Sequence, residues 1–328
     1  MDIPVFEKLR EERIITDIDL EKVKIFQHSQ PVAVYWELRS LLYFGILLLT
    51  TGVAIIIYKN INTIGHDVIV SAIALSCAGC FLYCFKKSKN YSNTKVTSPN
   101  VWFDYVILLG CLLLVTLVAY VQFIYNAFGK EWGLATFIPM VVLFMSAYYF
   151  DHIGILSLAI TNLAAWIGIT ITPIQILTDN DFSGERVILS GICLGAGLVA
   201  FAALGAKRNI KIHFEFTYKN FGAHILFIAL LAALFHFENI YLLIILAFAI
   251  IAYFFYKNAL KENSFYFLVI TLLYSYIAAG YFFVRIFEMA GDSIGAIYLG
   301  LIYFIASGIA LIRVLMYFNK TINSNDSI

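Results

Sequence analysis

The chain has 328 residues, of which 62% are hydrophobic and 13% are charged, with 22 Lys and Arg residues against 21 Asp and Glu. An ordinary soluble domain has about 25% charged residues, so this composition excludes a soluble fold. The balanced net charge gives no reason to expect a nucleic-acid partner. The five cysteines lack the paired spacing of a disulfide framework or a structural zinc site.

The first 39 residues are polar, and acidic residues occupy the part where a signal peptide would have its apolar run. We therefore expect a retained cytosolic segment over residues 1–39. The run Thr16-Asp17-Ile18-Asp19 predicts a helix start, with a hydroxyl cap and early acids that suit the positive end of the helix dipole. Two interpretations stay open: a helix that packs on its neighbours, or a module that binds a partner.

Ten apolar segments follow, each near the length of about 20 residues that a helix needs to cross the hydrocarbon core. Their continuous apolar character predicts helices instead of the alternating strands of a barrel. The sequence thus indicates an all-α polytopic membrane domain over residues 40–318 and a short cytosolic tail over 319–328. The segments are Leu41–Tyr58, Val68–Phe85, Trp102–Tyr125, Leu134–Tyr149, Ile153–Thr170, Val187–Leu204, Phe221–Phe237, Tyr241–Tyr256, Ser264–Phe283 and Ile294–Tyr317.

The basic residues divide unequally between the two sides that ten crossings define. The poorer side holds only Lys59, Lys130, Arg186 and Arg285, and the other 18 of the 22 Lys and Arg residues fall on the side of both termini. Cytoplasmic loops carry the excess of Lys and Arg. Both termini are therefore predicted to be cytoplasmic.

The stretch Ile171–Arg186 is the long polar interruption between the first five and the last five apolar segments. An odd number of helices per half would make any repeat an inverted one, which is a transporter architecture, although the halves share no motif beyond hydropathy. Pro173 interrupts an apolar run, and we expect a short interfacial or re-entrant segment over 171–177. Asp179 to Gly184 copies the start of a calcium loop, but Ser190 stands where the bidentate Glu is needed, so an Asx turn is favoured.

The front of the chain resembles a known family. The run Arg13-Ile14-Ile15-Thr16-Asp17-Ile18-Asp19-Leu20-Glu21-Lys22-Val23, followed by the entry Arg39-Ser40-Leu41-Leu42-Tyr43-Phe44-Gly45 into the first apolar segment, is similar to the DUF2157 family of predicted bacterial membrane proteins. The resemblance covers about the first third of the chain. It implies a bacterial inner-membrane protein and carries no activity over to any residue.

Polar side chains at membrane depth are costly unless they are paired or serve a pathway. No Asp, Glu, Lys or Arg lies at the centre of a predicted segment, which disfavours a simple relay of carboxylates. Five softer polar residues do lie near mid-depth. They predict either a polar cavity or hydrogen bonds between helices and to the helix's own carbonyls. They are Ser157, Thr161, Asn162, Thr271 and Ser275.

The predicted outer face is acidic, with a candidate cluster from the central stretch and from the connection that follows the ninth segment. Its members are Asp179, Asp181, Glu185, Glu288 and Asp292. Arg285 and Glu288 are spaced to pair with each other, and either could meet the central stretch instead. No metal is assigned to this cluster.

Other residues with chemical potential have simpler interpretations. His224 and His236 are about 18 Å apart on one helix at about 1.5 Å per residue, too far for one metal. The Cys77-x-x-Cys80 pair lacks a cation that would stabilise a thiolate. Gly191 and Gly195 form a GxxxG motif that predicts a close helix crossing. Asp104 and Asp151 lie at helix ends, where the dipole explains a carboxylate.

Function follows less directly than architecture. The helix count and the mid-depth polar groups favour a small-molecule permease or exporter. The alternative is a membrane scaffold or sensor that binds a protein partner through the N-terminal segment or the acidic outer face. No nucleophile, base and orienting group can be assembled, so we expect no enzyme and no cofactor. The expected partners are the lipid bilayer and either a small-molecule substrate or a protein, and no nucleic acid.

Overall fold

A computed structural model describes residues 65–129, 131–171, 184–289 and 294–325, together with residues 9, 10, 12, 15–17, 19–21, 48, 52, 55 and 59. The chain divides into two compact units, Met1–Ile69 and Val70–Ile328. The first predicted segment, 41–58, lies outside the described residues apart from Leu48, Gly52 and Ile55, which are helical.

In the first unit, the predicted helix start is confirmed. The Thr16 hydroxyl accepts a hydrogen bond from the backbone N–H of Asp19 at 3.3 Å and donates one to the Asp19 carboxylate at 2.5 Å. The Asp19 carboxylate also accepts the backbone N–H of Thr16 at 3.3 Å, so the pair satisfies two backbone donors that a helix start leaves free. Leu20, just inside the helix, is buried.

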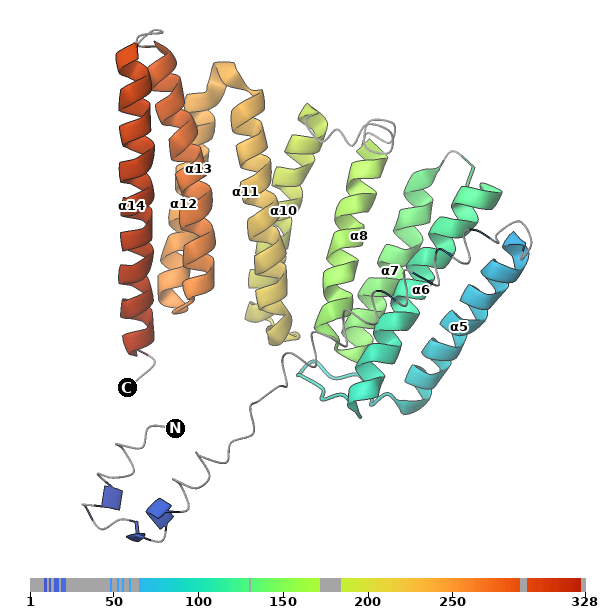
Figure 1. Ribbon diagram of the computed structural model, residues 1–328. Coiled ribbons are helices and arrows are strands. Elements are labelled where there is room, and N and C mark those ends of the chain that lie inside the picture. The colour runs from blue at the N-terminus through green and yellow to red at the C-terminus, as the bar shows by residue number, and fades with distance from the viewer. Residues whose placement is uncertain are drawn as a thin grey trace. The chain divides into compact units, whose positions relative to one another are not determined.

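Every secondary-structure element among the described residues is helical (Figure 1). The α-helices run antiparallel to their chain neighbours, and one turn of 3₁₀-helix (η) precedes each of α11 and α12. They are α5 His66–Lys87, α6 Val101–Tyr125, α7 Trp132–Phe150, α8 Ile153–Ile171, α10 Glu185–Lys207, η1 Ile212–Phe214, α11 Glu215–His236, η2 Glu238–Ile240, α12 Tyr241–Lys261, α13 Phe265–Met289 and α14 Ile294–Asn325.

Within the described residues, nine helices are long and apolar enough to cross a membrane. They correspond to the second to tenth predicted segments, so the prediction of an all-helical polytopic membrane protein is confirmed. The last helix runs to Asn325, eight residues beyond its predicted end at Tyr317. The orientation of the termini and the division into two five-helix halves stay predictions, and the proposed interfacial segment 171–177 lies outside the described residues, apart from Ile171 at the end of α8.

Two helix pairs pack more extensively than the others, α7 with α8 and α10 with α11. The second pair depends on glycine. A Cβ added at Gly195 would lie 2.6 Å from the backbone nitrogen of Leu226, and one at Gly191 would lie 3.1 Å from Ala229 Cβ. The close crossing predicted from the GxxxG motif is confirmed, because only glycine lets the two backbones approach so far.

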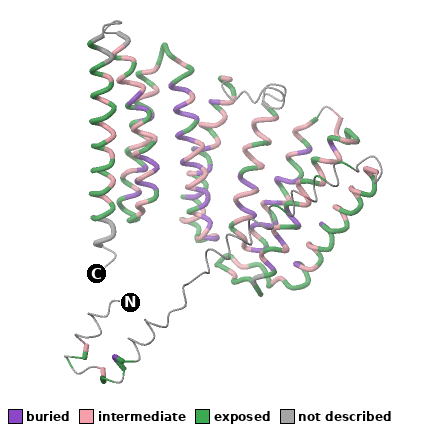
Figure 2. The backbone as a smooth tube through the Cα atoms, in the orientation of Figure 1, coloured by how far each residue is buried: buried purple, intermediate pink, exposed green. Residues whose placement is uncertain are grey.

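The buried side chains form two clusters. One joins α5, α6, α7 and α8 to α10, η1 and α11, with Leu143, Leu156 and Leu198 among its members, and the other joins α11, α12 and α13 around Phe227 and Leu268. Figure 2 shows buried positions along α7, α8 and α11, whereas the described side chains of α14 are only partly buried or exposed. Apolar side chains that point away from these clusters suit a hydrocarbon solvent, in which they need no protein cover.

Candidate functional site

The predicted mid-depth polar residues mostly bond to their own helices. The hydroxyls of Ser157, Thr161 and Thr271 donate to carbonyls four residues earlier, at 3.1, 2.9 and 2.7 Å. Asn162 differs, because its Oδ1 is buried and has no hydrogen-bond partner. Ser275 is half-buried on α13. Hydroxyl bonding back to the helix, the second of the two predicted roles, therefore accounts for three of the five.

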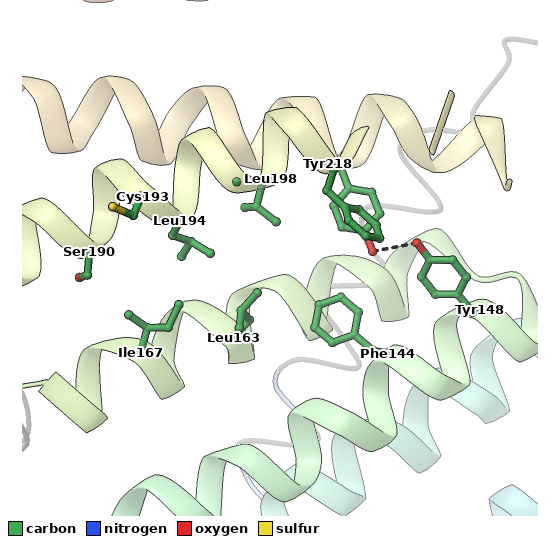
Figure 3. Close-up of a pocket in the computed structure, with 11 residues that line it drawn as sticks. Phe144, Tyr148, Leu163, Ile167, Ser190, Cys193, Leu194, Leu198 and Tyr218 are labelled. Carbon is green, nitrogen blue, oxygen red and sulfur yellow. Dashed lines mark hydrogen bonds between the residues drawn. The ribbon is translucent and has the colours of Figure 1, made fainter. Parts of the chain in front are cut away.

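A cavity of about 570 Å³ lies between the α7/α8 pair and the α10/α11 pair (Figure 3). A second cavity of about 540 Å³ continues along α8 and α10, with Ile167, Ser190 and Leu194 lining both. We call the two together the inter-pair groove. The first cavity is lined by Phe144, Tyr148, Leu163, Ile167, Ser190, Cys193, Leu194, Gly197, Leu198, Phe201 and Tyr218.

The inter-pair groove is apolar along most of its length. Ser190, a shared lining residue, donates its hydroxyl to the Val187 carbonyl at 2.8 Å. Thr161 is the one predicted mid-depth residue among its lining side chains. The space between these two helix pairs is therefore not the polar cavity that the sequence predicts. Its apolar walls suit an apolar or amphipathic molecule.

Two tyrosines close one end of the first cavity. Tyr148 of α7 and Tyr218 of α11 share a hydrogen bond between their hydroxyls at 3.1 Å, drawn as the dashed line in Figure 3. The Phe214 ring packs edge-on against Tyr148, with ring centroids 5.3 Å apart. These aromatic side chains connect the two helix pairs at the end where α7 and α10 finish. We call this end of the helices the Asp151 end.

A buried charge cluster lies at the Asp151 end. The Asp151 carboxylate is 3.2 Å from Lys211 Nζ and 2.5 Å from His213 Nε2, and it accepts a hydrogen bond from the backbone N–H of Val96. The Asp151 and Lys211 side chains are each 1% exposed. We call Asp151, Lys211 and His213 the Asp151 cluster.

Local backbone geometry places the members of the cluster. Asp151 ends α7 with a left-handed φ of 58°, and Lys211 precedes η1 with a left-handed φ of 46°. This backbone conformation is unfavourable for residues other than glycine, which adopt it only where surrounding contacts stabilise it. Lys211 is held by its backbone N–H to the Asn93 carbonyl at 2.8 Å and by its Nζ to the Thr94 carbonyl at 3.4 Å.

The sequence interpretation of Asp151 is incomplete. Asp151 stands in the turn before α8, where a helix dipole favours a carboxylate, but it also caps the carboxyl end of α7 and is paired with a buried lysine and a histidine. In the sequence analysis, Lys211 is only one of the 18 basic residues on the side of both termini. The available signal was Lys211-x-His213 beside a helix start, and nothing in the sequence linked it to a residue 60 positions earlier.

At the opposite end, the acidic residues pair across helices. Glu238 of η2 lies 2.5 Å from Arg285, which also donates to the Tyr281 hydroxyl at 2.9 Å. Glu185 lies 3.8 Å from His236. Of the predicted acidic cluster, Asp179, Asp181 and Asp292 and the side chain of Glu288 lie outside the described part of the chain, so the predicted Arg285–Glu288 pair stays a prediction.

Other titratable residues form smaller sets. His224 bonds to the Tyr274 and Tyr266 hydroxyls at 2.9 and 3.3 Å. Lys219 lies 2.6 Å from both Glu215 and Glu262. Across the residues with described side chains, no group of three or more His, Cys, Asp or Glu is placed to hold a metal ion.

Comparisons with known proteins concern the first part of the chain. Residues 7–156 match the model of the family DUF2157, described as a predicted membrane protein. No curated protein and no solved structure matches the chain. The match runs beyond the first third that the resemblance was expected to cover and ends inside α8. It confirms the resemblance to the DUF2157 family of predicted membrane proteins over residues 7–156.

Proposed function

We propose that the protein is a permease or exporter that binds a lipophilic small molecule in the inter-pair groove. The observation that carries this proposal is the groove itself, an apolar cavity between two pairs of membrane-length helices. Ligand sites typically have volumes of about 300–1,000 Å³ and mostly apolar walls with a few polar groups. The groove fits this description, with the Tyr148 and Tyr218 hydroxyls at one end.

The packing on either side of the groove also supports this function. Contacts are extensive within the α7/α8 pair and within the α10/α11 pair but sparse between the pairs. Transporters commonly rock one helix bundle against another around a site at the repeat or bundle interface. An interface with few close backbone approaches that already contains a cavity is suited to such a motion.

The proposed setting is the bacterial cytoplasmic membrane, with both termini in the cytoplasm. Basic residues gather at the Asp151 end, among them Lys86, Lys87, Lys207 and Arg208. The positive-inside rule assigns this end to the cytoplasm. A reporter that is active only in the periplasm, fused after Ile328, should be inactive, and an active fusion would reverse the orientation.

One glycine offers a direct test of the groove. A Cβ added at Gly197 meets no atom within 4 Å, and Gly197 lines the first cavity, so Gly197→Phe should fill the cavity without disturbing the backbone. Gly79 of α5 is equally open and lines neither cavity, which makes Gly79→Phe the matched control.

The assay measures accumulation of the lipophilic dye N-phenyl-1-naphthylamine, and of a panel of lipophilic cations, in cells that produce each variant. Export predicts less accumulation with the wild type and with Gly79→Phe, and accumulation at the level of empty cells with Gly197→Phe. If Gly197→Phe matches the wild type for every compound whose export the wild type supports, the groove is not the pathway. Wild-type cells indistinguishable from empty cells throughout would favour the scaffold or sensor role.

A further inference from the structure

We propose that the Asp151 cluster is a latch that closes the inter-pair groove at the Asp151 end. The latch acts on the proposed transport pathway and in that sense rests on the proposed function. Its members come from opposite sides of the groove. Asp151 lies in the turn between α7 and α8, whereas Lys211 and His213 lie in the connection between α10 and α11.

The latch is continuous with the end of the groove. Tyr148 lies one turn before Asp151 on α7, and Tyr218 lies one turn inside α11. The Phe214 ring is 5.3 Å from the ring of Tyr148 and 4.6 Å from that of His213. The tyrosine hydroxyl pair, Phe214 and the charge cluster therefore form successive layers between the cavity and this end of the helices.

The loop between α5 and α6 covers the latch. Val96 donates its backbone N–H to Asp151, Thr94 accepts from Lys211 Nζ, and the Tyr91 ring lies 5.3 Å from that ammonium group. The same pair of charges thus holds three connections together. Release of the pair would free the loop and the two helix turns at once.

The burial of the pair gives the latch two distinct states. With both side chains 1% exposed, the charges are stable only while they are paired and hydrogen-bonded. A partly separated pair would leave unsolvated charges, so the intermediate positions are unfavourable. The closed state keeps the pair buried, and the open state lets water reach both groups and, behind them, the groove.

Cys193 provides a native reporter of that access. It lines the first cavity and is exposed there, whereas Cys77, Cys84 and Cys111 are buried and Cys80 is half-buried. In a Cys80→Ala background, a lipophilic maleimide should label Cys193 in the wild type. A charged, membrane-impermeant maleimide, added to vesicles from the Asp151 side, should label it slowly while the latch is closed.

The test compares this slow labelling in full-length variants. Asp151→Asn should raise the rate with the charged maleimide by roughly tenfold or more. The double variant Asp151→Asn, Lys211→Met should do the same without leaving a buried unpaired charge, which guards against a folding defect in the single variant. Asp104→Asn is the matched control, since Asp104 lies at the same end and bonds to Ser98. Its rate should stay at the wild-type level.

Two results would overturn the latch: an unchanged rate in the double variant when it labels normally with the lipophilic maleimide, or an equal rise in Asp104→Asn. The outcome is separable from the proposed function. A rise in labelling specific to Asp151 with no dye export in any variant would uphold the closure and refute the permease. If Gly197→Phe blocks export but labelling is unchanged in the Asp151 variants, the permease would be upheld and the latch refuted.

Discussion

The close crossing of α10 and α11 makes a quantitative prediction at Gly195. In Gly195→Ala the added methyl group would lie 2.6 Å from the Leu226 backbone nitrogen and 2.8 Å from its Cα, contacts that only a movement of the backbone can relieve. Overpacking of this kind costs about 1–3 kcal/mol, and contact with backbone atoms puts the cost near the upper figure. The better helix propensity of alanine offsets about 1 kcal/mol.

The expected net loss of stability is therefore about 2 kcal/mol, which corresponds to a fall in Tm of about 4–8 °C at about 2–4 °C per kcal/mol. Thermal unfolding in detergent can be followed by the reaction of the fully buried thiols of Cys84 and Cys111 with a thiol-reactive dye. Gly79→Ala, whose new Cβ touches nothing, should instead raise Tm slightly. If the two variants shift Tm equally, the crossing does not depend on glycine at position 195.

Two further predictions concern the Asp151 end. Lys211→Met alone should destabilise the protein by about 3–5 kcal/mol, because it leaves the buried Asp151 carboxylate without its cation. Adding Asp151→Asn should recover much of this loss of stability in the same thiol assay. If stability is not recovered, the lysine acts through its own packing. His152 accepts the Ile155 backbone N–H on Nδ1 at 3.2 Å, and burial lowers its pKa below the ordinary 6.5 against the opposing charge of Asp104. Because the pKa is lowered in the folded protein, the unfolded chain binds the His152 proton more readily than the folded protein does. The contribution of neutral His152 to the free energy of unfolding is therefore complete above about pH 6.5 and is lost as the pH falls below that value. Between pH 7.5 and 5.5, the Tm of His152→Asn should drop by less than the Tm of the wild type, because asparagine keeps a capping side chain that does not titrate. An identical drop in both proteins would exclude His152 as the source of the pH dependence.

The membrane fold could be predicted from the sequence because the bilayer imposes a length and a composition on each helix. Glycine spacing also carried information across the fold, since Gly191 and Gly195 mark a surface that admits another backbone. The partner of that surface, the Leu226 face of α11, could not be identified in this way. The constraint on glycine is steric and does not specify which helix approaches.

The groove and the Asp151 cluster could not be predicted because both depend on contacts between distant connections. Asp151 and Lys211 are ordinary loop residues by hydropathy, and their pairing follows from how two helix turns meet. Polar residues at mid-depth were a poor guide to the cavity, because hydroxyls such as Ser157 and Thr271 bond to their own helices. The cavity is lined instead by apolar residues such as Leu163 and Leu194, which have no polar group to distinguish them from the rest of their apolar segments.

The proposed function requires a lipophilic molecule to bind between the α7/α8 pair and the α10/α11 pair. The most direct measurement is photolabelling of the full-length protein in membranes with a diazirine-bearing fatty acid, followed by mapping of the modified residues by mass spectrometry. Binding in the inter-pair groove predicts saturable adducts on groove residues such as Leu163, Ile167 and Leu194, lost in Gly197→Phe and retained in Gly79→Phe. Adducts spread evenly over exposed helices such as α12 and α14, and unchanged by Gly197→Phe, would contradict it.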